Sequence, residues 1–175
     1  MEGQLQAIAK TSDDKRFGWG MLALRITFAL VFLLNGIAKL PGHWDGIHPF
    51  PGFLITWDGA RNILEHNVQT HPIAPYKWLI DNVVLEYYTV FGILVAVTEL
   101  AIGVMLLFGV FTPVAALTGA AFVLHINFST WDRDVWMFEG MVEWGPLLAL
   151  ALMRGGRYNG LDRRLAARYP QWPLT

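Results

Sequence analysis

The chain has 175 residues, of which 54% are apolar and 15% are charged, and its formal net charge is −1. Because an average soluble domain carries about 25% charged residues, this composition predicts one integral membrane domain over residues 1–175. The absence of cysteine excludes CxxC redox chemistry, c-type haem attachment, thiolate-bound iron–sulfur clusters and disulfides. The sequence contains no stripe of basic residues of the kind that binds nucleic acid. Its candidate metal ligands also lack the spacing typical of a metal site.

The first membrane-spanning helix is predicted over residues 18–40, because this stretch is long and largely apolar. The polar residues 1–17 before it are interpreted as a solvated arm. A signal peptide is an alternative, but the apolar stretch is too long for one and no A-x-A-like cleavage site follows it. Pro41 ends the predicted helix. The span contains Arg25, Asn35 and Lys39, spaced too widely for all of them to reach the helix ends.

A long segment, residues 42–84, follows the first span and is rich in tryptophan, histidine and proline. Since tryptophan prefers the headgroup region of a bilayer, we expect this segment to form a cap on the outer face of the helices. Residues 56–68 are predicted to form a short helix in that plane, and residues 76–84 to lead without a break into the second span. The segment's histidines lack the spacing of a zinc site.

Three further spans are predicted, over residues 85–111, 113–128 and 135–153. The stretch from Tyr87 to Phe111 would extend about 37 Å as a helix, enough to cross a hydrocarbon core of about 30 Å. Thr112 followed by Pro113 is typical of a helix N-terminus, with Thr112 as the N-cap. The second and third spans are therefore expected to form a tight antiparallel hairpin.

Lysine and arginine are distributed unequally between the two predicted faces. The N-terminal arm and the C-terminal tail carry Lys10, Lys15, Arg16, Arg154, Arg157, Arg163, Arg164 and Arg168, whereas the outer segments carry Arg61, Lys77 and Arg133. By the positive-inside rule, both termini face the cytoplasm and residues 42–84 face outward. The predicted fold is an all-α integral membrane protein, a four-transmembrane-helix antiparallel bundle with a long Trp-rich outer segment between helices 1 and 2.

Glu99 is the ionisable residue nearest the middle of the second span. A carboxylate at that depth costs about 2.5–3.5 kcal/mol, so it is expected to face the bundle interior and a partner. Rise per residue places Arg25 roughly 10 Å and Glu99 about 18 Å above the inner ends of their helices, which makes Arg25–Glu99 the simplest internal pair. A purely structural role for that pair is the alternative, because buried ion pairs are weak evidence for function.

A second group of polar residues is predicted to gather near the outer ends of the helices. We expect a wet cavity there, roofed by residues 42–84, with Glu139 and Glu143 sharing one helix face. Simpler readings stay open: Lys39 can snorkel alone, Glu139 can stabilise a helix N-terminus, and His125 can bond locally. The members of this group are Asn35, Lys39, His125, Asn127, Glu139 and Glu143.

Three segments together resemble the DoxX/DoxD family of small four-helix membrane proteins. They are FLLNGIAKLPG (32–42), TELAIGVMLLFGVFTPVAAL (98–117) and GGRYNGLDRRL (155–165). The Trp-rich outer segment is similar to the DoxD branch, whose members resemble the membrane subunit of thiosulfate:quinone oxidoreductase. The positions that match the family pattern are Arg25, Gly36, Lys39, Glu99, Gly103 and Asp162.

The resemblance implies a redox-associated protein of a bacterial or archaeal cytoplasmic membrane, with quinone as the candidate cofactor and no haem, iron–sulfur cluster or metal. In the first reading, the chain is an oxidoreductase subunit. Glu99, Glu139, Glu143 and His125 then act in proton transfer, and Arg25, Asn35, Lys39, Asn127 and Arg133 bind an anionic sulfur substrate. In the second reading, it is a non-catalytic subunit of a larger bioenergetic complex. The expected partners are the lipid bilayer and either other membrane subunits or further copies of the chain; a small transporter is a weaker third reading.

Overall fold

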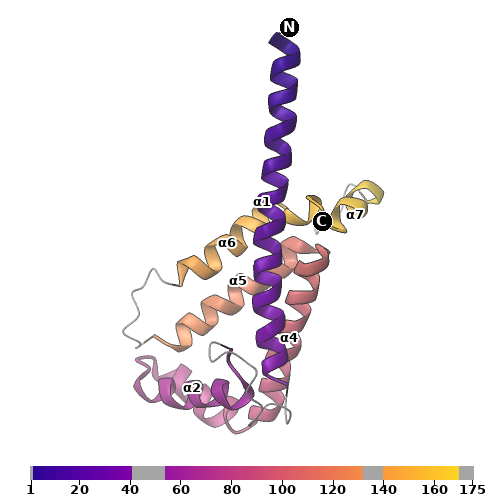
Figure 1. The fold of residues 1–175 in the computed structure, drawn as a ribbon. Helices are drawn as coiled ribbons and strands as arrows, with labels where there is room; N and C mark the ends of the chain where they lie inside the picture. The colour runs from indigo at the N-terminus through magenta and orange to yellow at the C-terminus, as the bar shows by residue number, and fades with distance from the viewer. Residues whose placement is uncertain (1, 41–53, 132–139, 170–175) are drawn as a thin grey trace.

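The computed structural model of the chain describes residues 2–40, 54–131 and 140–169, and within them every regular element is a helix (Figure 1). These elements are α1 (Glu2–Ala38), α2 (Trp57–Thr70), α3 (Ala74–Leu79), the π-helical turn η1 (Ile80–Val84), α4 (Tyr88–Phe108), α5 (Thr112–Ser129), α6 (Met141–Leu152), the 3-10 turn η2 (Gly155–Arg157) and α7 (Asp162–Arg168).

Three of these helices are long and apolar enough to cross a membrane: Asp13–Ala38 within α1, then α4 and α5. The fourth predicted span, 135–153, is represented by the shorter apolar helix α6. Residues 135–139 lie outside the described residues. The predicted count of four crossings therefore stays a prediction.

The helices pack around one apolar core. α1 lies beside α4, α4 turns back into α5, and α5 packs on α6. Small and branched side chains from all four meet there, and their close packing excludes water. The fully buried members are Ala29, Leu106, Ala116, Leu147 and Leu150.

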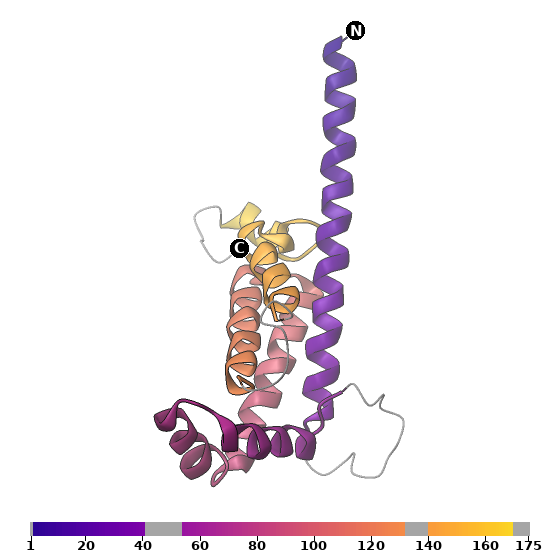
Figure 2. The same cartoon turned by 90° about the vertical axis from the view of Figure 1, so that its left-hand side faces the viewer.

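The molecule has two distinct ends. α2 lies across one end of the long helices (Figures 1 and 2). η2 and α7 lie at the other end, where the N-terminal part of α1 extends beyond the other helices. The N-terminal part of α1 and the helix α7 thus lie toward one end, and the segment from Leu54 to Val84 caps the other. This is the relative arrangement that the charge distribution predicts.

Two predicted boundaries differ from the structure. α1 begins at Glu2 rather than at residue 18, so the N-terminal arm is helical. Residues 2–38 contain no proline. Because adding residues to an existing helix is easier than starting a new one, the membrane-spanning part of α1 can extend into the arm. The predicted unbroken entry into the second span is wrong: after η1 the chain turns at residues 85–87, and α4 begins at Tyr88. The predicted short helix is confirmed as α2, with the Thr56 hydroxyl accepting the N–H of Gly59 at 3.2 Å.

The hairpin between α4 and α5 is as tight as predicted. α4 ends at Phe108, and Gly109 takes a left-handed backbone conformation (φ 63°) that glycine adopts without steric cost. The prediction that Thr112 is the N-cap is wrong, since Phe111 occupies that position and Thr112 is the first helical residue. The cap comes from far along the chain: the Asp162 carboxylate accepts the N–H groups of Phe111 and Thr112 at 2.7 and 2.8 Å.

Candidate functional site

Lys39 and Glu99 form a buried ion pair between α1 and α4. Lys39 Nζ donates to Glu99 Oε1 at 3.0 Å and lies 2.9 Å from Oε2, and the two side chains are 7% and 5% exposed. The ammonium group also donates to the carbonyl oxygen of Asn35, one turn earlier, at 3.4 Å. Glu99 therefore faces the interior with a cationic partner, as predicted, but its partner is Lys39. The predicted Arg25–Glu99 pair is wrong.

Two glycines bring these helices close enough for the pair to form. A Cβ placed on Gly36 would lie 3.0 Å from the backbone nitrogen of Leu100, and one on Gly103 would lie 2.8 Å from that of Leu33. Each glycine thus sits directly against the opposite backbone, the arrangement that small residues permit between membrane helices. The spacings of Gly36 to Lys39 and of Glu99 to Gly103 place the charged residues beside this close approach.

The segment that follows α1 is tied down over the pair by polar contacts. Asn35 Oδ1 accepts the N–H of Ile55 at 3.2 Å, and Tyr88 donates its hydroxyl to the carbonyl oxygen of Trp57 at 2.7 Å. The Trp57 ring also packs where a Cβ on Gly92 would stand. We call residues 54–84 the cap.

His71 fixes the far side of the cap to α5. Its Nδ1 accepts the N–H of Ile73 at 3.2 Å, so the proton is on Nε2, which lies 3.1 Å from the carbonyl oxygen of Phe128 and donates to it. Both ring nitrogens are therefore used in anchoring. This loop histidine has a structural role.

Between the cap and the helices lies an apolar cavity of about 350 Å³, with the ion pair at its base. Lys39 and Glu99 line it together with His125, and most of the remaining wall is aliphatic or aromatic. Glu99 Oε2 accepts no hydrogen bond from the described part of the chain. The aromatic wall residues are Trp57, Tyr76, Tyr88, Phe91 and Phe122.

Asn35, Asn127 and Glu143, three of the other predicted outer residues, do not line this cavity. Asn35 secures the cap, and the Asn127 amide lies against Gly140. Glu143 is exposed on α6, and no residue of that helix lines the cavity. Glu139 and Arg133 lie outside the described residues.

Arg25 is buried near the opposite end of the molecule, in a second polar cluster. Its guanidinium donates to the carbonyl oxygens of Tyr158 at 3.2 Å and Asn159 at 3.0 Å. The same loop places Asp162 on the α4–α5 turn, where its own N–H also donates to the carbonyl of Gly109 at 2.8 Å. We call this cluster of Arg25, Asp162 and residues 155–160 the inner clasp.

The glycines of the inner clasp leave room for its charged groups. A Cβ on Gly160 would lie 2.5 Å from Arg25 Nη1, and one on Gly156 would overlap the Asp162 carboxylate. Arg25 is 2% exposed and Asp162 is fully buried, and each charged group is held by backbone partners: Arg25 donates to carbonyl oxygens and the Asp162 carboxylate accepts N–H groups. This position and these partners make Arg25 a structural residue in the fold.

The comparisons with known proteins give one assignment. A family model described as DoxX matches residues 20–131, more than half of the chain. The chain belongs to the DoxX family. The matched region of this DoxX protein contains Lys39, Glu99 and both glycines of the helix contact, and the C-terminal part of the inner clasp follows it. No curated protein and no solved structure matches the chain.

Sequence reasoning missed the aromatic wall of the cavity and the true partner of Glu99. Tryptophan enrichment indicated a cap, but it did not indicate that Trp57 and Tyr88 enclose a chamber. A usable signal for the ion pair was present, since Gly36 and Gly103 each stand within about one helical turn of a charged residue, Lys39 and Glu99, respectively. A shared glycine contact would have aligned those two charges rather than Arg25 with Glu99.

Proposed function

We propose that this DoxX-family membrane protein is the quinone-binding subunit of a membrane oxidoreductase, and that the quinone ring occupies the cavity beneath the cap. The observation that carries this proposal is the combination of a mostly apolar, partly enclosed chamber with one buried ion pair at its base. Sites for small amphipathic molecules have this composition, with volumes of about 300–1,000 Å³ and few polar groups that fix orientation.

The residues at the base fit a quinone head group. The Lys39 ammonium can donate a hydrogen bond to a ring carbonyl oxygen, and the Glu99 carboxylate can accept one from a ring hydroxyl. The aromatic wall offers flat surfaces against which a planar ring can stack. The carbonyl groups of the oxidised quinone and the hydroxyl groups of the reduced quinol thus each have a hydrogen-bonding partner.

Quinone supplies the electron-accepting chemistry when bound, and its reduction takes two electrons and two protons. Glu99 and Lys39 are the proposed proton-handling groups at the base, and His125, which also lines the cavity, is proposed to exchange protons with the outside. Thiosulfate is the proposed electron donor because of the DoxD resemblance. A small anion suits this apolar chamber poorly, since its lysine is already paired with a carboxylate, so we assign donor oxidation to a partner subunit.

We further propose that α6 and the residues before it complete a fourth crossing, with both termini in the cytoplasm of a bacterium or archaeon. The shared end of the N-terminal region and α7 supports an even number of crossings.

Titration of the purified protein with a short-chain, water-soluble ubiquinone analogue tests the site. Ala60 lines the cavity from α2, whereas Asn62 on the same helix is exposed and does not line it. We expect Ala60→Phe to fill the chamber and weaken analogue binding at least tenfold, and the matched control Asn62→Phe to bind as the wild type does. Equal binding by both variants would contradict the proposal.

The protonation role is tested in membranes supplied with thiosulfate and the same analogue. We expect Glu99→Gln to depress turnover. Glu143 is an exposed carboxylate outside the cavity, so Glu143→Gln should leave turnover unchanged.

The second candidate function, a non-catalytic subunit, is favoured by the inner clasp, which uses its charged residues to join helices. Absence of quinone binding by the wild type would leave that reading in place.

A further inference from the structure

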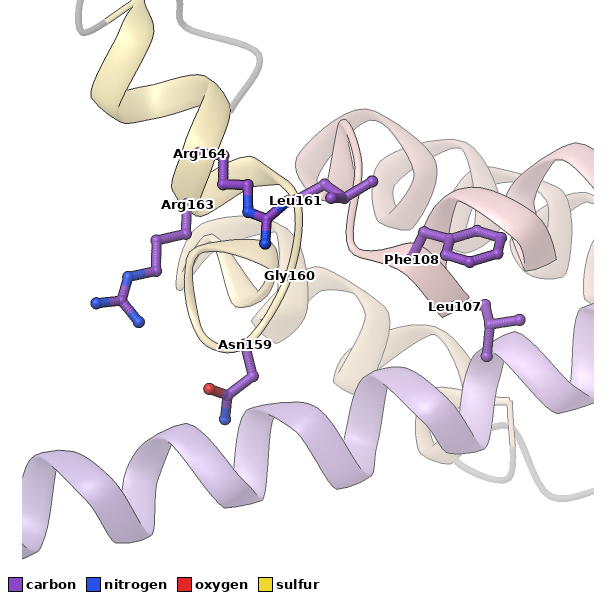
Figure 3. Close-up of a pocket in the computed structure, with 7 residues that line it drawn as sticks. All are labelled: Leu107, Phe108, Asn159, Gly160, Leu161, Arg163 and Arg164. Carbon is purple, nitrogen blue, oxygen red and sulfur yellow. The ribbon is translucent and has the colours of Figure 1, made fainter.

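A second cavity, of about 430 Å³, lies at the other end of the molecule from the cap. Two segments far apart in sequence form it: the last turn of α4, and the stretch from the clasp loop into α7 (Figure 3). The lining residues are Leu107, Phe108, Asn159, Gly160, Leu161, Arg163 and Arg164.

The lining divides into an apolar part and a cationic part. Leu107 and Phe108 end a membrane-spanning helix, and Phe108 is 56% exposed. Arg163 and Arg164 are also exposed, and their guanidinium groups form no ion pair with the described residues. Apolar surface next to arginine is the transition expected where a bilayer's hydrocarbon meets its headgroups.

The C-terminal segment at this end carries an excess of basic residues. Residues 154–169 contain five arginines and one acidic residue, Asp162. Asp162 is fully buried and directs its carboxylate at the backbone of the α4–α5 turn. It is therefore not presented to solvent beside the two arginines.

The inner clasp holds the cavity in shape. Leu161 N–H donates to the carbonyl oxygen of Phe108 at 3.1 Å, which fixes the loop against the end of α4. Arg25 holds the adjacent Asn159 carbonyl. The two arginines follow directly in α7, so their backbone positions are set before any ligand arrives, which lowers the entropic cost of binding.

We propose that this cavity binds the phosphate headgroup of an anionic membrane phospholipid. Arg163 and Arg164 contact the phosphate oxygens, for which a guanidinium offers paired N–H donors. Phe108, Leu107 and Leu161 receive the first part of the acyl chains. Basic pockets at the cytoplasmic ends of membrane helices recognise anionic lipid headgroups in this way.

The test measures lipid binding to the full chain in zwitterionic detergent, with phosphatidylglycerol, phosphatidylcholine and inorganic phosphate added separately and bound lipid detected by native mass spectrometry. We expect phosphatidylglycerol to bind more tightly than phosphatidylcholine. Each arginine near a membrane surface contributes about fivefold in affinity, so Arg163→Gln/Arg164→Gln should weaken phosphatidylglycerol binding about 25-fold.

The matched control removes two neighbouring cations elsewhere at the same end. Lys15 and Arg16 are exposed on α1 and do not line the cavity, and Lys15→Gln/Arg16→Gln should leave phosphatidylglycerol binding within twofold of wild type. Equal weakening by the two double variants would show that net charge, and not this cavity, attracts the lipid. Equal affinity for both lipids, or inorganic phosphate binding as tightly as phosphatidylglycerol, would also overturn the proposal.

Discussion

At the scale of single residues, the chain buries its charges in two neutral sets at opposite ends of the helices. Lys39 and Glu99 neutralise each other beneath the cap, and Arg25 shares the inner clasp with Asp162. A lone charge at membrane depth is costly. The Lys39–Glu99 pair therefore makes the burial of both charges tolerable, and the loss of one member leaves the other uncompensated.

The buried pair is expected to contribute more to stability than an exposed one. Lys39→Met should lower the free energy of unfolding by about 3–5 kcal/mol, because Glu99 is left as an unpaired buried charge. Lys39→Met/Glu99→Leu should recover much of that loss. Thermal unfolding in detergent measures both variants.

The control for this comparison is the exposed pair of Arg61 and Glu65, 2.8 Å apart on α2. Arg61→Gln should cost under about 1 kcal/mol, as exposed pairs usually do. A loss for Lys39→Met no larger than that of Arg61→Gln would show that the buried pair is not a stabilising unit.

At the scale of elements, the contact between α1 and α4 depends on two positions without side chains. Gly36 and Gly103 let each backbone touch the other helix. The resulting proximity aligns Lys39 with Glu99 at the base of the cavity. The helix contact and the candidate site are therefore parts of one feature.

We expect Gly103→Ala to destabilise the protein by about 1–3 kcal/mol, since the added methyl group would overlap Leu33 and force the helices apart. Gly20→Ala is the matched control on α1, because a Cβ there meets nothing within 4 Å. It should be neutral or stabilising by up to about 1 kcal/mol through helix propensity. Chemical unfolding in detergent distinguishes them, and equal effects would contradict the close-contact interpretation.

The C-terminal loop caps α5 across a sequence separation of 50 residues. Asp162→Asn replaces one carboxylate oxygen with an NH2 group that cannot accept a backbone N–H. We expect a loss of about 3 kcal/mol, the value of a buried charge-assisted hydrogen bond with an orphaned donor. The exposed Asp14→Asn on α1 should change stability by less than about 0.5 kcal/mol, and a comparable change in both variants would argue against the capping role.

At the scale of the whole molecule, the two ends differ in charge and chemistry. The cap end carries the aromatic chamber, and the clasp end carries the exposed arginines. From the positive-inside rule we predict that the clasp end faces the cytoplasm. A lipophilic ligand and an anionic headgroup would then bind at opposite faces of the membrane.

This orientation can be tested by single-cysteine labelling, because the chain has no cysteine of its own. Asn62→Cys on α2 and Arg168→Cys on α7 are both at exposed positions. With a membrane-impermeant maleimide added to spheroplasts, we expect labelling of Asn62→Cys alone, and of Arg168→Cys only after the membrane is opened. The reverse pattern would contradict the predicted topology.

The sequence by itself determined the class of the protein, the positions of α4, α5 and their hairpin, the short helix of the cap and the family. These depend on local composition, hydropathy and turn residues, which act over a few neighbouring positions. The sequence also predicted that Glu99 is buried and has a cationic partner, because a charge at membrane depth is costly whichever residue neutralises it.

Only the tertiary structure decided which charges meet. Depth estimates paired Glu99 with Arg25, since rise along a helix says nothing about rotation around it or about the chain beyond the bundle. The glycine contact turned Lys39 toward Glu99 instead. Arg25 donates hydrogen bonds to carbonyl groups of the C-terminal loop instead. Asp162 caps the N-terminus of α5 in place of Thr112, a role that its local sequence did not indicate. Such pairings arise from packing between distant segments, where a close helix approach selects one partner among several of equal charge.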